Sequence, residues 1–241
     1  VARLRIKRGA VTGVEALTPR GVEVHSARQV VLSAGALQSP LLLMRSGLGR
    51  AAMLERSGLR VEADIPGIGQ NLQEHPTIAI GGFLRRTGVQ SADLRPGISI
   101  MLRMTSRCPR SAPSDLFIGV PNKVAWHAFG QRVAALNIAL NRPESRGEIR
   151  LERRHEGPAP VFDFNMLGDP VDLERMRAGF RQAWSIMSSP EVRELVATAF
   201  MASFAPRVLR ANRRTRWNGV DRKSTRLNSS HSSVSRMPSS A

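Results

Sequence analysis

Small side chains follow an apolar run near the start of the chain, where a ligand could lie against the backbone. The run Val30–Leu32 is typical of a buried strand and ends at Ser33–Ala36. A helix is predicted from Ser39 to Met44, because Ser39 can accept from free backbone N–H groups and Pro40 suits a first turn. An α/β sheet presents ligands beyond the carboxyl end of a strand in this order of elements. The predicted ligand wall consists of Ala34, Gly35 and Ala36. Tight packing of strand on helix is a second, compatible interpretation.

Three blocks of sequence form a pattern more specific than any single glycine motif. The first is Gly35-Ala36-x-x-Ser39-Pro40, followed by Leu43-Met44 and Ser46-Gly47-Leu48-Gly49. The second is the turn-rich stretch Ile65–Pro76, and the third reads Pro-Glu-Ser-Arg-Gly-Glu-Ile-Arg-Leu over residues 143–151. In this order the blocks resemble the glucose–methanol–choline (GMC) family of FAD-dependent oxidoreductases. Glu74 stands where that family usually has Asp.

The resemblance implies an enzyme that oxidises a small-molecule alcohol at a CH–OH group, near the choline-dehydrogenase-like members of the family. A base removes the hydroxyl proton, and a hydride passes from carbon to the cofactor FAD. The family places the second block near the boundary of the FAD domain. Asn71 could hydrogen-bond the flavin or close the turn, and both roles stay open. The cofactor-binding candidates implied are therefore Ala34, Gly35, Ala36, Asn71, Leu72 and His75.

No catalytic residue is assigned. The family's base is a histidine near its C-terminus, paired with a second His or Asn, and none of the chain's five histidines has those surroundings. The motif Gly-x-Gly-x-x-Gly, which cradles a dinucleotide pyrophosphate, does not occur either. Val1 is not a start residue, so we expect an internal fragment that is inactive as it stands. The electron acceptor, a membrane quinone or another, is not indicated.

The charge of the chain favours an alternative from another class. The formal net charge is +17, which is typical of a basic nucleic-acid-binding module. However, residues 206–241 hold nine of the basic residues against Asp221 alone, and nearly all basic residues are Arg. The one cysteine, Cys108, excludes an intrachain disulfide and a multi-cysteine metal site, so a cytoplasmic location is expected. No apolar run approaches membrane-spanning length.

The remaining patterns predict elements on both sides of the three blocks. Residues 1–33 indicate two or three strands, and Arg146 is expected to hold its turn by hydrogen bonds to carbonyls. Further strands are predicted at 78–84, 115–120, 133–140 and 148–151, with 98–103 a strand or a short helix. Helices are predicted at 51–57, 171–188 and 190–200. In the second of these, Leu173, Met176, Phe180, Trp184 and Met187 are spaced to face a core.

These elements predict an α/β (α+β) fold in which part of an FAD-binding Rossmann-like domain precedes a substrate domain with a mainly antiparallel sheet. We place the FAD-binding part at residues 1–80 and the substrate domain at 81–205. Residues 206–241 are interpreted as a disordered tail, because the end is serine-rich. Within it, residues 221–241 resemble a translated sequencing-library adapter, which we exclude from the fold.

Overall fold

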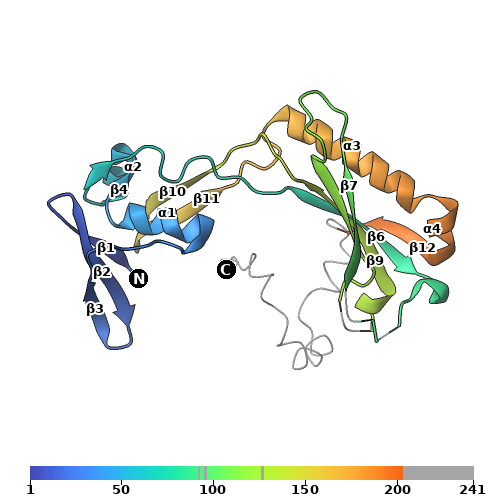
Figure 1. Ribbon diagram of the computed structural model, residues 1–241, viewed down its shortest axis with the longest axis horizontal. Coiled ribbons are helices and arrows are strands. Elements are labelled where there is room, and N and C mark those ends of the chain that lie inside the picture. The colour runs from blue at the N-terminus through green and yellow to red at the C-terminus, as the bar shows by residue number, and fades with distance from the viewer. Residues whose placement is uncertain (92, 95–96, 126–127, 203–241) are drawn as a thin grey trace. The chain divides into compact units, whose positions relative to one another are not determined.

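A computed structural model describes residues 1–202 except 92, 95–96 and 126–127. The chain divides into two compact units (Figure 1). The first consists of Val1–Pro76 and Pro143–Leu173, and the second of Thr77–Arg142 and the described residues from Glu174. Residues 143–173 thus belong to the first unit. The predicted division near residue 80 assigns them instead to the substrate domain. The tail predicted at 206–241 lies outside the described residues.

A three-stranded antiparallel sheet opens the first unit. Its strands β1 (Arg3–Lys7), β2 (Ala10–Thr18) and β3 (Gly21–Ser26) pair in sequence order. The register of β1 on β2 shifts between Arg5 and Ile6, opposite Gly13. Gly13 has φ +151°, and a Cβ there would collide with the His25 carbonyl. The prediction of two or three strands is confirmed as three.

Helix α1 (Gly35–Arg45) begins four residues before the predicted start at Ser39. The Ser39 hydroxyl accepts from the Ala34 N–H at 3.1 Å, so it ties down the residue before the helix. Val30–Leu32 is not a strand, and Val31 is 80% exposed, so the prediction of a buried strand there is wrong. The reason is that no strand of the described residues pairs with this run, and unpaired backbone groups favour an exposed segment.

The remaining elements of the first unit enclose one hydrophobic cluster. Strands β4 (Leu48–Gly49) and β5 (Ala63–Asp64) pair in parallel, and helix α2 (Ala51–Arg56) lies between them in sequence. Strands β10 (Glu148–Arg154) and β11 (Gly157–Asp163) form an antiparallel pair on which both helices pack. The buried cluster consists of Leu41, Met44, Met53, Leu54, Leu72, Ile149 and Leu151.

The turn before β10 is held by side chains, as its sequence predicted. Arg146 Nη1 donates to the carbonyls of Pro143 at 2.8 Å, Glu144 at 2.9 Å and Ser145 at 3.1 Å, which confirms its structural role. The buried carboxylate of Asp172 accepts from the Glu144 N–H at 3.0 Å and from the Ser145 N–H at 2.7 Å. The turn is therefore fixed from both sides.

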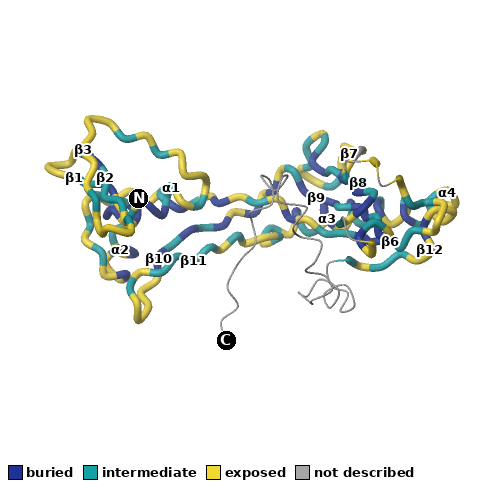
Figure 2. Tube along the Cα trace, turned by 90° about the horizontal axis from the view of Figure 1, so that it is seen from below, coloured by how far each residue is buried: buried dark blue, intermediate teal, exposed yellow. Residues whose placement is uncertain are grey.

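The second unit is built on a five-stranded antiparallel sheet in the order β12-β6-β9-β8-β7. Its core, which includes Ile80, Leu116 and Ile138, is dark blue in Figure 2. Helix α3 covers one face, and Gly179 comes so close that a Cβ would lie 2.9 Å from the Ile138 side chain. The elements are β6 (Thr77–Leu84), β7 (Ile98–Met104), β8 (Leu116–Pro121), β9 (Val133–Leu140), β12 (Val196–Met201), α3 (Pro170–Met187), α4 (Pro190–Leu195) and the 3₁₀ helices η1 (Arg86–Gly88) and η2 (Gly130–Arg132).

Two predictions in this unit are wrong. The helix predicted at 190–200 ends at Leu195, and the chain continues as the edge strand β12. Partner β6 supplies Gly81 and Gly82, which leave room for Phe200 and Val196, so strand pairing overrides the helical pattern. Trp184, which the helical spacing predicts to face the core, is 43% exposed and stacks on Phe180 with ring centroids 6.2 Å apart.

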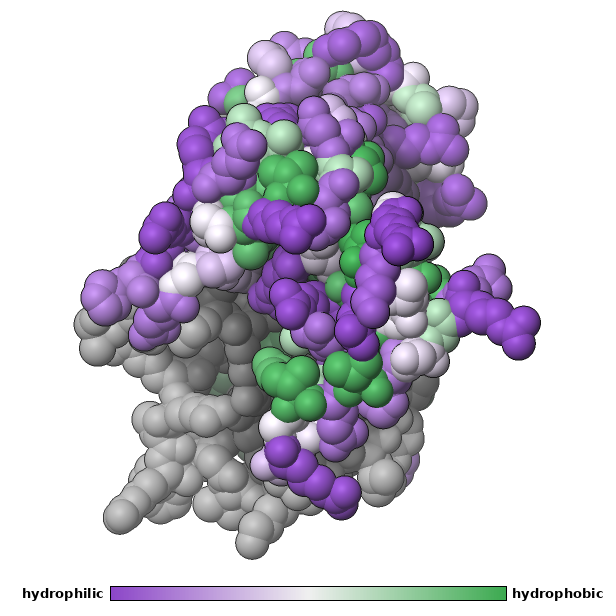
Figure 3. Space-filling view, turned by 90° about the vertical axis from the view of Figure 1, so that its left-hand side faces the viewer, coloured by the Kyte–Doolittle hydropathy of each residue, from purple (hydrophilic) through white to green (hydrophobic). Residues whose placement is uncertain are grey.

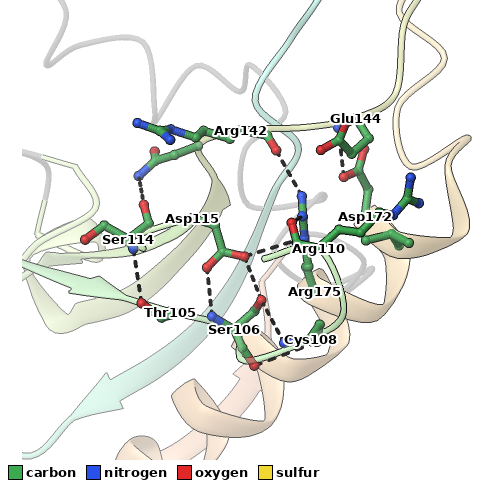
Figure 4. A network of polar contacts seen from close by, with 12 residues as sticks. Thr105, Ser106, Cys108, Arg110, Ser114, Asp115, Arg142, Glu144, Asp172 and Arg175 are labelled. Carbon is green, nitrogen blue, oxygen red and sulfur yellow. Dashed lines mark hydrogen bonds and ion pairs between the residues drawn. The ribbon is translucent and has the colours of Figure 1, made fainter. Parts of the chain in front are cut away.

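A buried ion pair joins α3 to the sheet (Figure 4). Asp115 is fully buried and accepts from the Ser106 N–H at 2.7 Å and the Ser106 hydroxyl at 2.6 Å. Arg175 Nε lies 3.6 Å from the same carboxylate, and its Nη1 donates to the Arg142 carbonyl. Each charge is thus compensated where water is excluded.

Removal of the Asp115 carboxylate should destabilise the protein strongly. Asp115→Ala leaves the Arg175 charge buried, so we expect a loss of about 3 kcal/mol in the free energy of unfolding. The measurement is urea denaturation followed by circular dichroism. Asp93→Ala, at an exposed aspartate, is the control and should change stability by about 0.5 kcal/mol or less. Equal effects of the two substitutions would contradict this role.

Gly147 should tolerate no side chain. A Cβ there would collide with the backbone of Asp163 and Phe164, which cannot rotate away. Gly147→Ala should therefore cost about 2 kcal/mol, measured as a lower urea midpoint. Gly67 has no atom within 4 Å of a Cβ position, so Gly67→Ala should leave the midpoint nearly unchanged. A Gly147→Ala midpoint as high as that of Gly67→Ala would refute the close approach.

Candidate functional site

The small residues predicted to line a ligand are exposed at the N-terminus of α1. Ala34, Gly35 and Ala36 are all in the exposed class. Gly35 has φ +85°, and a Cβ there would meet no atom within 4 Å. Apart from the Ala34–Ser39 hydrogen bond, no side chain of the described residues caps the start of the helix. The backbone is thus open to close approach by a ligand.

The start of α1 has the chemistry to hold an acceptor group. The first four N–H groups of an α-helix have no partner within the helix, and the helix dipole places partial positive charge there. Such ends bind phosphates and other acceptors when the side chains are small enough for contact. These residues therefore fit one wall of a site for a phosphate-bearing cofactor such as FAD.

The second predicted segment is a loop in which Asn71 and His75 are exposed and Leu72 is buried. Asn71 is exposed and has φ +59°, a left-handed conformation that asparagine adopts more readily than most residues. Leu72 is buried and pairs with Gly147 through two backbone hydrogen bonds of 3.0 and 2.8 Å. His75 is exposed, and its backbone N–H donates to the Glu74 carboxylate at 2.8 Å. Cofactor binding by these residues stays a prediction.

The two segments are anchored to the same core. Leu41 and Met44 of α1 belong to the hydrophobic cluster that also contains Leu72. The cluster fixes α1 and the loop to β10. The exposed start of α1 therefore belongs to a helix that is held in place by its buried side chains. Leu72 therefore contributes to the site through packing, because its side chain is directed into the core.

Charged residues surround the end of the loop near β10. Gln70 donates to Glu148 at 3.2 Å, and Arg150 contacts Glu148 and Glu152 at 3.3 and 3.0 Å. The hydrogen bond with Glu152 raises the pKa of Arg150 above its ordinary value. These pairs fix the polar edge of the loop.

The sequence did not reveal the importance of Asp172. It lies in the first turn of α3, is fully buried and accepts three hydrogen bonds from the turn at Glu144–Ser145. The neighbouring Asp169 does cap α3, since it accepts from the Val171 N–H at 2.8 Å. The available signal was the Pro-x-Ser turn, whose N–H groups needed an acceptor.

Metal sites and membrane-spanning helices concern the described part of the chain only. No group of three or more His, Cys, Asp or Glu side chains there is arranged to hold a metal ion. None of the helices in that part is long and apolar enough to cross a membrane.

The chain matches the family models of the GMC oxidoreductases at residues 1–77 and 143–238. The second match extends beyond the described residues and into the segment that resembles an adapter. The chain is 35% identical to 5-(hydroxymethyl)furfural oxidase of Methylovorus sp. (strain MP688), covering 85% of this chain and 38% of that protein. It is 30% identical to an oxygen-dependent choline dehydrogenase of Sinorhizobium medicae, covering 79% and 41%.

Solved structures agree with these relatives. Pyridoxine 4-oxidase from Mesorbium loti superposes with a TM-score of 0.69 at 27% identity, covering 88% of this chain and 42% of that chain. Formate oxidase of Aspergillus oryzae RIB40 has the same TM-score at 22% identity, which shows the fold alone, over 83% and 44%. The α/β (α+β) fold is thereby confirmed. The chain spans about two fifths of the length of the curated relatives it matches.

The two roles of Asn71 can be separated by substitution. If Asn71 closes the turn, Asn71→Gly should keep the stability of the parent, because glycine adopts positive φ without strain. Asn71→Ala should cost about 1 kcal/mol at the same backbone angle. Thermal unfolding of the two variants measures the difference. Equal stability of Ala and Gly at this position would rule out the turn-closing role.

Proposed function

This chain belongs to the GMC oxidoreductase family, and from that premise we propose that it supplies one wall of the flavin site and part of the substrate domain of an FAD-dependent alcohol oxidoreductase. GMC oxidoreductases bind FAD. The activity proposed is that of a whole protein of this kind, since the chain spans about two fifths of its relatives.

The exposed start of α1 is the observation that carries the proposal. Its free N–H groups and the small residues Ala34, Gly35 and Ala36 would face the cofactor, because only a backbone without bulky side chains permits such contact. Asn71 would reach the cofactor from the loop, whereas Leu72 would hold that loop on the core. His75 would organise the loop before Pro76.

The bound FAD would supply a hydride acceptor for alcohol oxidation. The residues of this chain bind and orient in that reaction; none is assigned to proton transfer. In the second unit, the ion pair between Arg175 and Asp115 would keep α3 fixed on the substrate-domain sheet. The wall and the sheet are therefore supports for chemistry done at the flavin.

The proposed substrate is a small-molecule alcohol. The similar proteins bear the names of a 5-(hydroxymethyl)furfural oxidase, a choline dehydrogenase and a pyridoxine 4-oxidase. The alternative, a nucleic-acid-binding module, gains no support from these comparisons, and much of the charge behind it lies beyond the described residues. We also propose a cytoplasmic location, for which the single cysteine, Cys108, is the supporting observation.

The chain by itself should bind FAD weakly or not at all. We expect no flavin absorbance after gel filtration of the purified 241-residue protein mixed with FAD, and no bleaching by alcohols. A retained, alcohol-bleachable flavin would overturn this expectation.

In a protein that carries this chain together with the rest of the family pattern, anaerobic addition of an alcohol should bleach the flavin. Gly35→Val should lower flavin content, since valine strains the backbone at φ +85° and covers the exposed N–H groups. Gly67→Val, at a glycine with open space, is the control. A flavin that no alcohol reduces, or a Gly35→Val protein with full flavin content, would count against the proposal.

A further inference from the structure

A pocket of about 280 Å³ lies at the other end of α1, within the first unit. Its walls come from β1, from the turn Ser46–Gly47 after the helix, and from the segment Leu59–Glu62. The buried Leu4 and the half-buried Leu59 provide apolar surface. The volume is just below the range typical of drug-sized ligands, so the pocket suits a small molecule.

Positive charge predominates around this pocket. Five cationic side chains and only two carboxylates line it, which leaves an excess of three positive charges. Both carboxylates are already engaged: Glu15 with Arg3 at 2.6 Å, and Glu62 with Arg60 at 3.3 Å. The hydrogen bond between Arg3 and Glu15 lowers the pKa of Glu15 and raises the pKa of Arg3, so both side chains stay charged.

Two cations at the pocket are left without a protein anion. In the ranges that the structure describes, Lys7 and Arg45 form no ion pair and donate no side-chain hydrogen bond. Arg5 reaches Glu15 only at 3.9 Å, while Glu15 already holds Arg3. A small anion could therefore bind here without breaking an existing ion pair.

The last carbonyls of α1 are hydrogen-bonded at this place. Helix carbonyls at a C-terminus carry partial negative charge. Here the Ser46 and Gly47 N–H groups donate to the carbonyls of the last turn, and the Ser46 hydroxyl donates to the Leu42 carbonyl at 2.6 Å. Ser46 Oγ in turn accepts from the Leu4 N–H at 2.7 Å, which fixes β1 against the helix.

The pocket is separate from the proposed flavin wall. The wall lies at the N-terminal end of α1 and the pocket at its C-terminal end. A helix of 11 residues spans about 16 Å at 1.5 Å per residue.

Figure 3 shows a face of the molecule on which hydrophilic side chains predominate and smaller apolar areas lie between them.

We propose that this pocket binds a small organic anion, a carboxylate attached to a compact apolar body. Lys7, Arg45 and Arg5 would contact the carboxylate, and Leu4 and Leu59 would contact the apolar part. The apolar surface distinguishes this ligand from inorganic phosphate, and the unpaired cations distinguish it from a neutral molecule of the same shape. The site does not depend on FAD or on the alcohol chemistry.

Titration of the 241-residue protein with benzoate tests the proposal. Benzoate should bind saturably, and its neutral counterpart benzamide should bind about 10-fold more weakly, as should inorganic phosphate. Backbone amide shifts in NMR spectra should move at Leu4, Ile6 and Leu59 in the unmodified protein. Absent saturation, equal binding of benzamide, or tighter binding of phosphate would each overturn the proposal.

The double substitution Lys7→Gln with Arg45→Gln should weaken benzoate about 10-fold and leave benzamide unchanged. Both side chains are exposed, so the fold should persist, which circular dichroism checks. Lys123 is buried and unsuitable as a control; Arg20→Gln with Arg28→Gln removes the same charge at exposed positions outside the pocket. An equal loss in the control pair would mean that net charge alone attracts the ligand, and the site would be rejected. A variant that fails to fold leaves the amide shifts of the unmodified protein as the deciding result.

Discussion

The packing of α1 against β10 is the interaction on which the first unit depends. Leu41 and Met44 on the helix share one buried cluster with Ile149 and Leu151 on the strand. These residues are about a hundred positions apart, so the cluster joins two distant parts of the chain. The loop at Leu72 is added through its side chain and through the backbone bridge to Gly147. Loss of this cluster would loosen helix, loop and strand together, because all three contribute buried side chains to it.

Helix α1 is held by its buried face, which leaves both of its ends accessible to ligands. The N-terminal end of α1 has open N–H groups and small residues, which suits the acceptor groups of a cofactor. At the C-terminal end, the Ser46 hydroxyl donates to the Leu42 carbonyl and accepts from the Leu4 N–H of β1. Cationic side chains line the pocket beside it. The two ends thus differ in chemistry although they belong to one element. The difference follows from what each end leaves unsatisfied: N–H donors at the start, and side-chain cations at the finish.

Buried carboxylates organise the polar interior of both units. Asp172 collects the N–H groups of the turn before β10, and Asp115 holds Ser106 and the charge of Arg175 (Figure 4). A buried charge is tolerated only when it is paired and hydrogen-bonded. Each carboxylate therefore holds the groups that it contacts: Asp172 holds the turn before β10, and Asp115 links Ser106 to α3.

Sequence patterns were enough to predict the family, the turn at Pro143–Gly147 with the role of Arg146, and most strands of the second unit. These features depend on local order and alternation, which neighbouring residues specify. The fold was needed to establish that Val31 is exposed and that Val30–Leu32 is not a strand, that β12 is a strand, and that Trp184 is exposed. It also decided that residues 143–173 join the first unit. The physical reason is that strand pairing and burial depend on a partner surface far away in sequence, and the same apolar pattern is buried or exposed according to whether that partner is present.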